Sequence, residues 1–415
     1  RARFWFPSID HPSDKAAARF AVSAPAAWRV VANGRPLDPA ACRPPDPPTP
    51  PAGPRATSCW ATDHPIPTYT MVIGAAPFAV RPAGTACDPA GRPCIDVSVW
   101  TFPEDTARAA PSFRRAARMV EFYARLVAPF PYEKLAHVQS STRYGGMENA
   151  SAIFYDERAL ATGRDLETTV AHETAHQWFG DAVTETDWHH LWLSEGFATY
   201  FGALFFEHDD GPARFRELMD AARQRYLRSD RAGRPVLDTT ETDLFALLDE
   251  NNYQKGAWVL HMLRRLTGDS AFFRGIRDYY HAHAHGNALT DDLRRALERA
   301  AGTDLGWFFD QWLRRPGYPR LRTTWRWDAA RRAAELTIEQ TQPEEWPTFR
   351  FPLALEAETP HGTTRDTILV ERRRTTARIR LPARPTTIRL DPDHDLLAEI
   401  LPPEPAPPAP PGRPR

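Results

Sequence analysis

The chain has 415 residues, too many for one compact core and enough for two or three domains. Its 52 Lys and Arg residues nearly balance 53 Asp and Glu residues, so the formal net charge of -1 excludes a global positive field that would attract nucleic acid or an anionic membrane. No run is long and apolar enough to span a bilayer. We therefore expect a globular protein without nucleic-acid or membrane partners, whose function depends on a local site.

Short β-like runs separated by clusters of Pro, Gly and Asp fill residues 1–103 and predict an N-terminal β domain. The expected strands are residues 20–22, 28–32, 69–73 and 95–100. In residues 104–317 the apolar residues recur at helical spacing, which predicts a mainly helical domain with a strand at residues 135–139. The expected helices are residues 105–127, 165–180, 191–208, 213–228, 253–266, 270–284, 290–301 and 308–315.

In residues 318–401 the apolar period falls to two, which predicts a second β unit, most simply a sandwich. Residues 402–415 are rich in proline and are expected to form a disordered or polyproline-like tail. A second proline tract, residues 44–54, should also be extended. The expected fold class is therefore α+β with several domains.

Four cysteines, Cys42, Cys59, Cys87 and Cys94, all lie in the first hundred residues. The natural reading is two local disulfides, Cys42 with Cys59 and Cys87 with Cys94, because the second pair brackets a turn-rich loop and the first brackets a proline tract. Such bonds would indicate an oxidising compartment, periplasmic or extracellular, as for a secreted protein. Four reduced thiols remain the alternative. The chain opens without an initiator methionine or an apolar leader, so we expect no signal peptide within it.

Residues 172–176 read HETAH, an HExxH sequence inside one expected helix. On a helix, His172 and His176 lie on one face about 6 Å apart, which suits the binding of one metal ion. A hydrolytic zinc site takes three protein ligands and a water, and Glu195 in the next expected helix is the candidate third ligand. Glu173 points beside the metal, where it can act on the water. The alternative is a surface helix that carries two solvated histidines.

Gly145 and Gly146 come directly before Met147 and Glu148. Two adjacent glycines let another backbone approach closely, as a ligand-binding edge requires. This stretch is therefore a candidate substrate edge.

Several stretches together form an ordered series of motifs. They read RFWFPSID at residues 3–10, DKA at 14–16, GGMEN at 145–149, HETAHQWFGD at 172–181, LWLSEGFA at 191–198, YQKGA at 253–257 and FDQWL at 309–313. This series resembles the zinc aminopeptidases of the aminopeptidase N type, gluzincins that include leukotriene hydrolase. The resemblance covers roughly residues 1–317 and implies a thermolysin-like catalytic domain. Relatives carry further β structure before the block that begins at Arg3, so we expect the N-terminal β domain to be incomplete at its start.

The resemblance implies that His172, His176 and Glu195 bind one Zn²⁺ per chain. It also implies that Glu173 is the general base that activates a zinc-bound water to hydrolyse the N-terminal peptide bond of peptides. Such a metal polarises the scissile carbonyl and lowers the pKa of its water toward about 7, and a carboxylate beside it can accept the proton.

The resemblance further implies that Glu148 binds the free α-amine of the substrate and that Tyr253 stabilises the tetrahedral intermediate. The edge formed by residues 145–147 would pair with the peptide backbone, as in strand addition. Tyr144, just before it, would line the pocket for the first side chain. The implied partners are peptides with a free N-terminus.

Three alternatives remain at this point: a zinc endopeptidase, an epoxide hydrolase, and a binding or scaffold protein that keeps the fold without turnover. Glu148 discriminates against the first two, because an anchor for an α-amine is pointless for an internal bond. The joint presence of the ligands, Glu173 and Tyr253 weighs against a scaffold.

Overall fold

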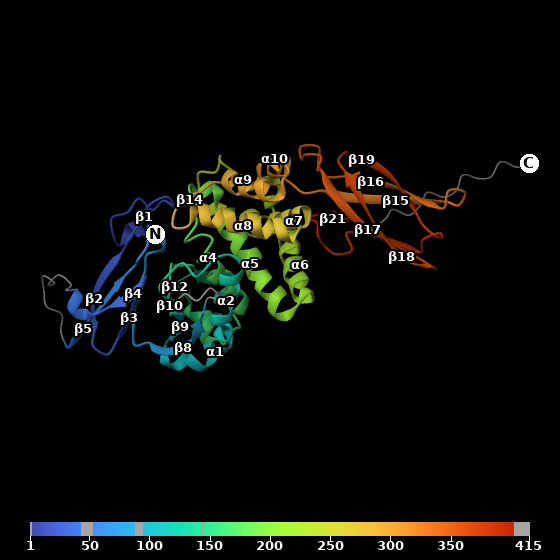
Figure 1. Cartoon of the computed structure of the whole chain (residues 1–415). Helices are drawn as coiled ribbons and strands as arrows, with labels where there is room; N and C mark the ends of the chain where they lie inside the picture. Colours follow the sequence, from blue (N-terminus) through green and yellow to red (C-terminus); the bar gives the residue numbers. More distant parts are fainter. Residues whose placement is uncertain (1, 43–52, 88–93, 143, 402–415) are drawn as a thin grey trace, which may run out of the picture.

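The structure is a computed structural model that describes residues 2–42, 53–87, 94–142 and 144–401. A β-rich N-terminal part and a β-rich C-terminal part lie at opposite ends of a helical middle (Figure 1). The expected α+β fold with several domains is thus confirmed. The predictions for residues 44–52 and for the tail 402–415 lie outside the described residues.

The N-terminal part consists of small antiparallel sheets with strand orders β2-β5-β4, β3-β7 and β1-β6. The strands are β1 (Lys15–Ala16), β2 (Arg19–Pro25), β3 (Arg29–Ala32), β4 (Arg35–Leu37), β5 (Arg55–Ala61), β6 (Ile66–Pro67) and β7 (Ile73–Ala76). The expected strand 69–73 is wrong in its first part. Thr68–Thr70 forms a 3₁₀ turn instead, in which the Thr70 hydroxyl donates to the Pro67 carbonyl at 2.9 Å. Disulfides join Cys42 to Cys59 and Cys87 to Cys94, as the sequence predicts.

A five-stranded sheet with the order β11-β12-β10-β9-β8 joins the N-terminal part to the helices. Its strands are β8 (Ala79–Ala86), β9 (Ile95–Thr101), β10 (Leu135–Ser140), β11 (Gly146–Met147) and β12 (Ala152–Asp156). Alternate residues of β10 face opposite sides. Leu135 packs in the core with the helices, whereas Ala136 and Val138 pack against the N-terminal sheets. The domain limit predicted at residue 103 falls just after β9, within the span of this sheet, and the domain limits stay a prediction.

The helices surround α5, which is buried along nearly its whole length. A helix that is apolar on all sides needs neighbours on all sides, and α4, α6 and α7 pack against it. None of the helices in the described part of the chain has the length and apolar character of a membrane span. The helices are α1 (Thr106–Phe113), α2 (Ala116–Leu126), α3 (Glu157–Ala161), α4 (Glu167–His176), α5 (Trp192–Asp210), α6 (Pro212–Arg228), α7 (Gly256–Thr267), α8 (Asp269–His283), α9 (Thr290–Ala301) and α10 (Gly306–Phe309).

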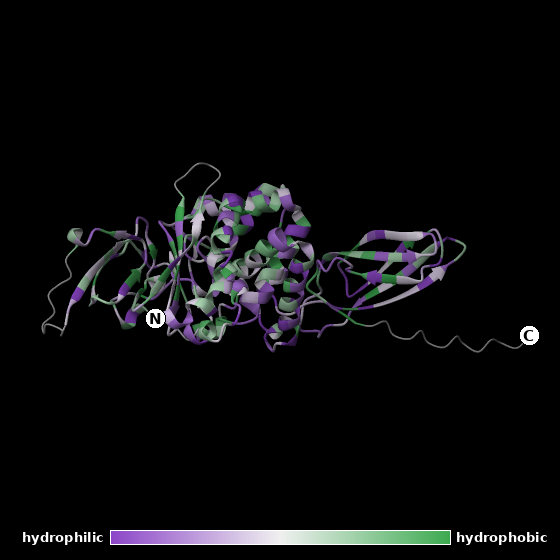
Figure 2. Ribbon diagram, turned by 90° about the horizontal axis from the view of Figure 1, so that it is seen from below, coloured by the Kyte–Doolittle hydropathy of each residue, from purple (hydrophilic) through white to green (hydrophobic). Residues whose placement is uncertain are grey.

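The C-terminal part is a sandwich of two sheets with the orders β19-β16-β15-β21 and β18-β17-β20. Apolar and polar residues alternate along these strands (Figure 2), and the inward residues of both sheets, such as Leu336 and Leu355, share one core. The strands are β15 (Arg320–Asp328), β16 (Ala333–Gln340), β17 (Phe351–Thr359), β18 (Gly362–Val370), β19 (Arg374–Arg380), β20 (Thr387–Leu390) and β21 (Glu399–Ile400).

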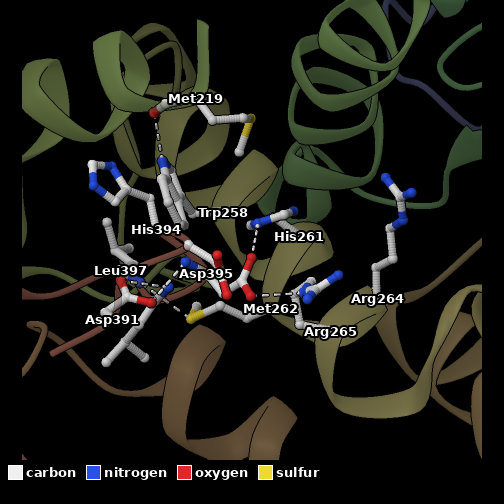
Figure 3. Close-up of polar contacts among 12 residues, drawn as sticks. Met219, Trp258, His261, Met262, Arg264, Arg265, Asp391, His394, Asp395 and Leu397 are labelled. Atoms are coloured by element: carbon white, nitrogen blue, oxygen red, sulfur yellow. Dashed lines mark hydrogen bonds and ion pairs between the residues drawn. The ribbon is translucent and has the colours of Figure 1, made fainter. Parts of the chain in front are cut away.

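The loop after β20 binds the helical middle through polar contacts that we name the Asp395 cluster (Figure 3). Asp395 Oδ1 lies 3.3 Å from His261 Nε2 on α7, and its Oδ2 accepts from Arg265 Nε at 2.8 Å. His394 Nδ1 lies 2.8 Å from Asp220 Oδ2 on α6. The Asp395 and Asp220 carboxylates therefore each face a cation or an imidazole.

The chain has only three lysines, and each joins segments that are distant in the sequence. Lys15 Nζ donates to three backbone carbonyls, two of them after α4 and one just before β14. Lys134 Nζ donates to the carbonyls of Ala32 and Ser151, both at 3.0 Å. Lys255 is fully buried, and its Nζ donates to the Gly317 carbonyl at 3.1 Å.

Candidate active site

The structure brings His172, His176 and Glu195 together at the point where α4 crosses α5. The two Nε2 atoms are 3.0 Å apart. Glu195 Oε2 lies 3.3 Å from His172 Nε2 and 3.2 Å from His176 Nε2. Within the described residues, this trio is the single group of three or more His, Cys, Asp or Glu with the geometry to hold a metal ion.

Contacts on the far side of each imidazole set its orientation. His176 Nδ1 lies 3.1 Å from the Phe179 carbonyl, and His172 Nδ1 lies 3.5 Å from the Thr199 hydroxyl. A carbonyl only accepts, so the Phe179 carbonyl favours a proton on His176 Nδ1 and orients Nε2 toward Glu195. The same chemistry is typical of histidines that bind metals.

The backbone after α4 makes this contact with Phe179 feasible. The helix was expected to end at Gly180, but it ends at His176, and the chain turns back at Gly180 with φ +124°. A Cβ on Gly180 would lie 2.9 Å from His176 Nδ1, so glycine is required at this turn.

The donor set fits Zn²⁺. Metal–ligand bonds of about 2.0–2.1 Å in a tetrahedron place neighbouring ligand atoms about 3.3 Å apart, close to the three observed separations. Glu195 Oε2, a buried carboxylate oxygen, has no hydrogen-bond partner among the described residues. These separations and donor types match those of a Zn²⁺ site, so the trio is a candidate metal site.

Glu173 lies beside this trio and is 6% exposed. Its carboxylate contacts the backbone of β11 so closely that a Cβ on Gly146 would lie 2.2 Å from Glu173 Oε1. Burial raises the pKa of Glu173 well above its ordinary value, with further contributions from Glu148 and Glu195. A carboxyl with a raised pKa is suited to accept and return a proton.

Glu148 follows β11, which is the edge strand of its sheet. The Gln177 side chain at the end of α4 fixes its backbone by donating to the Glu148 carbonyl at 3.0 Å. The Tyr69 hydroxyl hydrogen-bonds to its carboxylate. Burial raises the pKa of Glu148, although His176 and this hydrogen bond oppose the rise. Sequence reasoning missed Tyr69, because it placed that residue in a strand.

The candidate substrate edge is partly open. Gly146 and Met147 pair with Tyr155 and Phe154 of β12, and both are half-buried. A Cβ on Gly145 would meet nothing within 4 Å. Tyr144, predicted to line a pocket, is 42% exposed. Among the described residues, no strand pairs with the other side of β11, so this side could pair with another extended backbone.

Tyr253 lies in a π-helical turn, Asn251–Lys255, that precedes α7, so the expected α-helix starts three residues later than predicted. Its ring stacks on His172 with centroids 6.0 Å apart, and its hydroxyl hydrogen-bonds to Glu195. Burial raises the pKa of Tyr253 well above 10.0, so the phenol keeps its proton and can donate. α5 comes close to the backbone of this turn and of the start of α7, since a Cβ on Gly196 would lie 3.2 Å from the Asn252 carbonyl oxygen and 2.9 Å from Gly256 Cα.

Comparisons with known proteins agree with this geometry. Residues 112–312 match the model of the peptidase family M1 domain. Aminopeptidase N of Streptomyces lividans is 29% identical over 368 residues, which cover 82% of this chain and 40% of that protein. Tricorn protease-interacting factor F2 of Thermoplasma volcanium is 34% identical over 226 residues, 50% of this chain and 28% of that protein.

Among solved structures, Legionella pneumophila aminopeptidase A in complex with aspartic acid matches with a TM-score of 0.80 at 18% identity. The match covers 94% of this chain and 45% of that chain, and it shows that the fold is shared. Residues 112–312 therefore form a peptidase family M1 domain. The chain spans less than half the length of each of these relatives.

Proposed function

We propose that this protein is a zinc aminopeptidase that removes the first residue of peptides with a free N-terminus. The observation that carries the proposal is the juxtaposition of three groups: the His172–His176–Glu195 trio, the Glu173 carboxylate, and the Glu148 carboxylate beside an open sheet edge. The match of residues 112–312 to the peptidase family M1 domain and the similarity to aminopeptidases support it.

In this proposal Glu148 binds the substrate's α-ammonium group. A half-buried carboxylate forms a stronger ion pair than one in water, and a peptide with a blocked amine cannot form it. The free side of β11 offers backbone hydrogen bonds to the first residues of the peptide, so that the first peptide bond lies over the trio.

His172, His176 and Glu195 would hold Zn²⁺, which when bound polarises the scissile carbonyl and makes water more acidic. The Glu173 carboxylate accepts a proton from the attacking water and delivers it to the leaving nitrogen. The Tyr253 hydroxyl donates a hydrogen bond to the oxygen that gains negative charge, an interaction typically worth about 3–4 kcal/mol in the transition state.

The two disulfides support a further part of the proposal, that the protein acts in an oxidising compartment, periplasmic or extracellular.

Hydrolysis of aminoacyl anilides and of their N-acetylated forms tests the proposed function. We expect the wild-type protein to cleave only the free amines, and a chelator to abolish the activity. Glu173→Ala should lower kcat by about 10²–10⁴ because it removes the proton acceptor. Equal cleavage of free and acetylated substrates would refute the aminopeptidase assignment, and an active Glu173→Ala protein would refute the proposed mechanism.

A further inference from the structure

Glu185 is a buried acid that the proposed mechanism does not use. It ends β13 (Thr184–Glu185), which runs parallel to β14 (Asn287–Ala288), and it is 1% exposed. Its backbone carbonyl accepts from Asn287 Nδ2 at 3.1 Å. Its own backbone N–H acts on its carboxylate, but no other residue of the described chain donates to either carboxylate oxygen. A carboxylate in this position is costly unless a donor is supplied from outside the chain.

Lys15, whose charge interacts with Glu185, does not supply that donor. Its Nζ donates to the carbonyls of Asp181, Ala182 and Gly286 at 3.1, 3.0 and 2.6 Å. An ammonium group has three N–H bonds, so these three carbonyls use all of them. Lys15 thus offsets some of the negative charge near Glu185 without forming a hydrogen bond to it.

Two other polar groups near the candidate site are also occupied. The amide nitrogen of Gln177 donates to the Glu148 carbonyl at 3.0 Å and to Asp181 Oδ2 at 2.9 Å, which uses both of its protons. The Tyr69 hydroxyl donates to Glu148. Neither of these two side chains is therefore available to Glu185.

The electrostatic neighbours of Glu185 belong mainly to the candidate active site. Burial raises the pKa of Glu185 to about 8, and the charges that act on it are Glu148 and Glu195, which raise the pKa, and His176, which lowers it. The Tyr69 phenol packs against Trp188 with ring centroids 5.0 Å apart. Burial raises the pKa of Tyr69, and the charges of Glu148 and Glu185 raise it further. The remaining neighbour is the buried Tyr279 of α8.

We propose that Glu185 accepts hydrogen bonds from a cationic nitrogen of the substrate's first residue. This proposal rests on the proposed aminopeptidase function. Two groups carry the required chemistry: the α-ammonium group, which has three N–H bonds to share between Glu148 and a second acceptor, and the ammonium or guanidinium of a basic first side chain. Either group would provide the donor that Glu185 lacks within the described chain.

Glu185→Gln tests the proposal, because glutamine keeps the size of the side chain and cannot become a carboxylate. Kinetics on leucyl and arginyl anilides should show a KM about tenfold higher with kcat unchanged, since the interaction is made in the bound ground state. A rise for both substrates identifies the α-ammonium group as the partner, and a rise for the arginyl substrate alone identifies the side chain. Glu185→Asp, which keeps the charge, should give an intermediate KM.

Calorimetry with leucinamide, argininamide and the same amides without the α-amine gives a readout that is independent of turnover. Glu185→Gln should weaken the binding of amides that carry the nitrogen bound by Glu185 about tenfold. It should leave the binding of amides that lack this nitrogen unchanged. An equal loss of affinity for both kinds of amide would show a merely structural role and overturn the proposal. A KM of the Glu185→Gln protein equal to that of the wild-type protein would also overturn it. Glu356→Gln is the matched control, because Glu356 is a buried acid of the C-terminal sandwich, paired with Arg365 and Arg389.

The two levels of the proposal fail differently. If the wild-type protein neither cleaves nor binds free-amine ligands, and Glu148→Gln changes nothing, the aminopeptidase function is wrong. If the wild-type and Glu148→Gln proteins behave as expected while Glu185→Gln has wild-type constants, only the role of Glu185 is wrong.

Discussion

The candidate metal site and the Asp395 cluster are built from the same residue types in opposite ways. In the candidate site, two imidazole Nε2 atoms and one carboxylate oxygen face one another at 3.0–3.3 Å. In the Asp395 cluster, the oxygens of one carboxylate face different partners, His261 Nε2 at 3.3 Å and Arg265 Nε at 2.8 Å. The first arrangement brings three potential metal ligands together. The second pairs each oxygen of a carboxylate with a partner of its own.

This difference shows what distinguishes a metal site from a structural ion pair. Histidine–carboxylate distances are nearly equal in the two regions, so distance alone does not separate them. The contact of the other imidazole nitrogen separates the two regions. His176 Nδ1 lies against the Phe179 carbonyl, which leaves Nε2 available to bind a metal. Arg265, by contrast, brings a permanent charge to Asp395 and makes a bound cation unnecessary.

The largest expected effect separates the two regions by metal content. His176→Ala should lower bound zinc from about one ion per chain to near zero and reduce kcat/KM by at least about 10³, because two ligands hold Zn²⁺ poorly. Elemental analysis and anilide hydrolysis measure both quantities. His261→Ala is the control and should keep both the zinc and the activity. Loss of zinc in the His261 variant would contradict the comparison.

A smaller effect is expected on stability. Asp395→Ala should lower the free energy of unfolding by about 1–2 kcal/mol, because it leaves His261 and Arg265 without their acceptor at a partly buried contact between the helices and the sandwich. Denaturant titration gives this number, and activity per folded molecule should not change. Asp393→Ala removes an exposed pair with Arg365 and should cost less than about 1 kcal/mol. Equal losses of unfolding free energy in the two variants would contradict the claim that the Asp395 cluster stabilises the protein more than an exposed ion pair does.

The smallest effect concerns acid stability. Burial alone would raise the pKa of Asp395, but the hydrogen bond from His261 and the charge of Arg265 hold it below 3.8. A carboxyl with a lower pKa in the folded state stabilises the fold above its unfolded pKa, and this contribution is lost as the pH falls through the folded pKa. The unfolding free energy of the wild-type protein should therefore fall more than that of Asp395→Asn when the pH drops from about 5 to 3. Parallel pH profiles would contradict this assignment.

Local spacing explains why the trio could be predicted from the sequence. The HExxH spacing places His172 and His176 on one helical face, and the resemblance to known aminopeptidases adds Glu195, Glu148 and Tyr253. The structure brings these side chains together, and the two disulfides also join the predicted cysteines. The roles of the residues stay predictions.

Tertiary contacts explain what the sequence did not reveal. Tyr69 lies in a 3₁₀ turn 79 residues before Glu148, and no periodic pattern connects them. Gly180 was read as a helix end, but its positive φ serves the turn that orients His176. One feature of the sequence could have indicated Glu185. It is a charged residue in the run Val183-Thr184-Glu185-Thr186, in which the other residues favour a buried strand.

The three lysines, each of which joins distant segments, should make the folded protein react slowly with reagents that modify amines. Every lysine amine is hydrogen-bonded to backbone carbonyls of distant segments, and the remaining basic residues are arginines and histidines. Reagents that acylate amines act on a free, unprotonated nitrogen, so they will find few targets on the native surface. Acylation of the lysines then requires local or global opening of the fold, and the rate of labelling at each lysine reports how often the segments that it joins come apart.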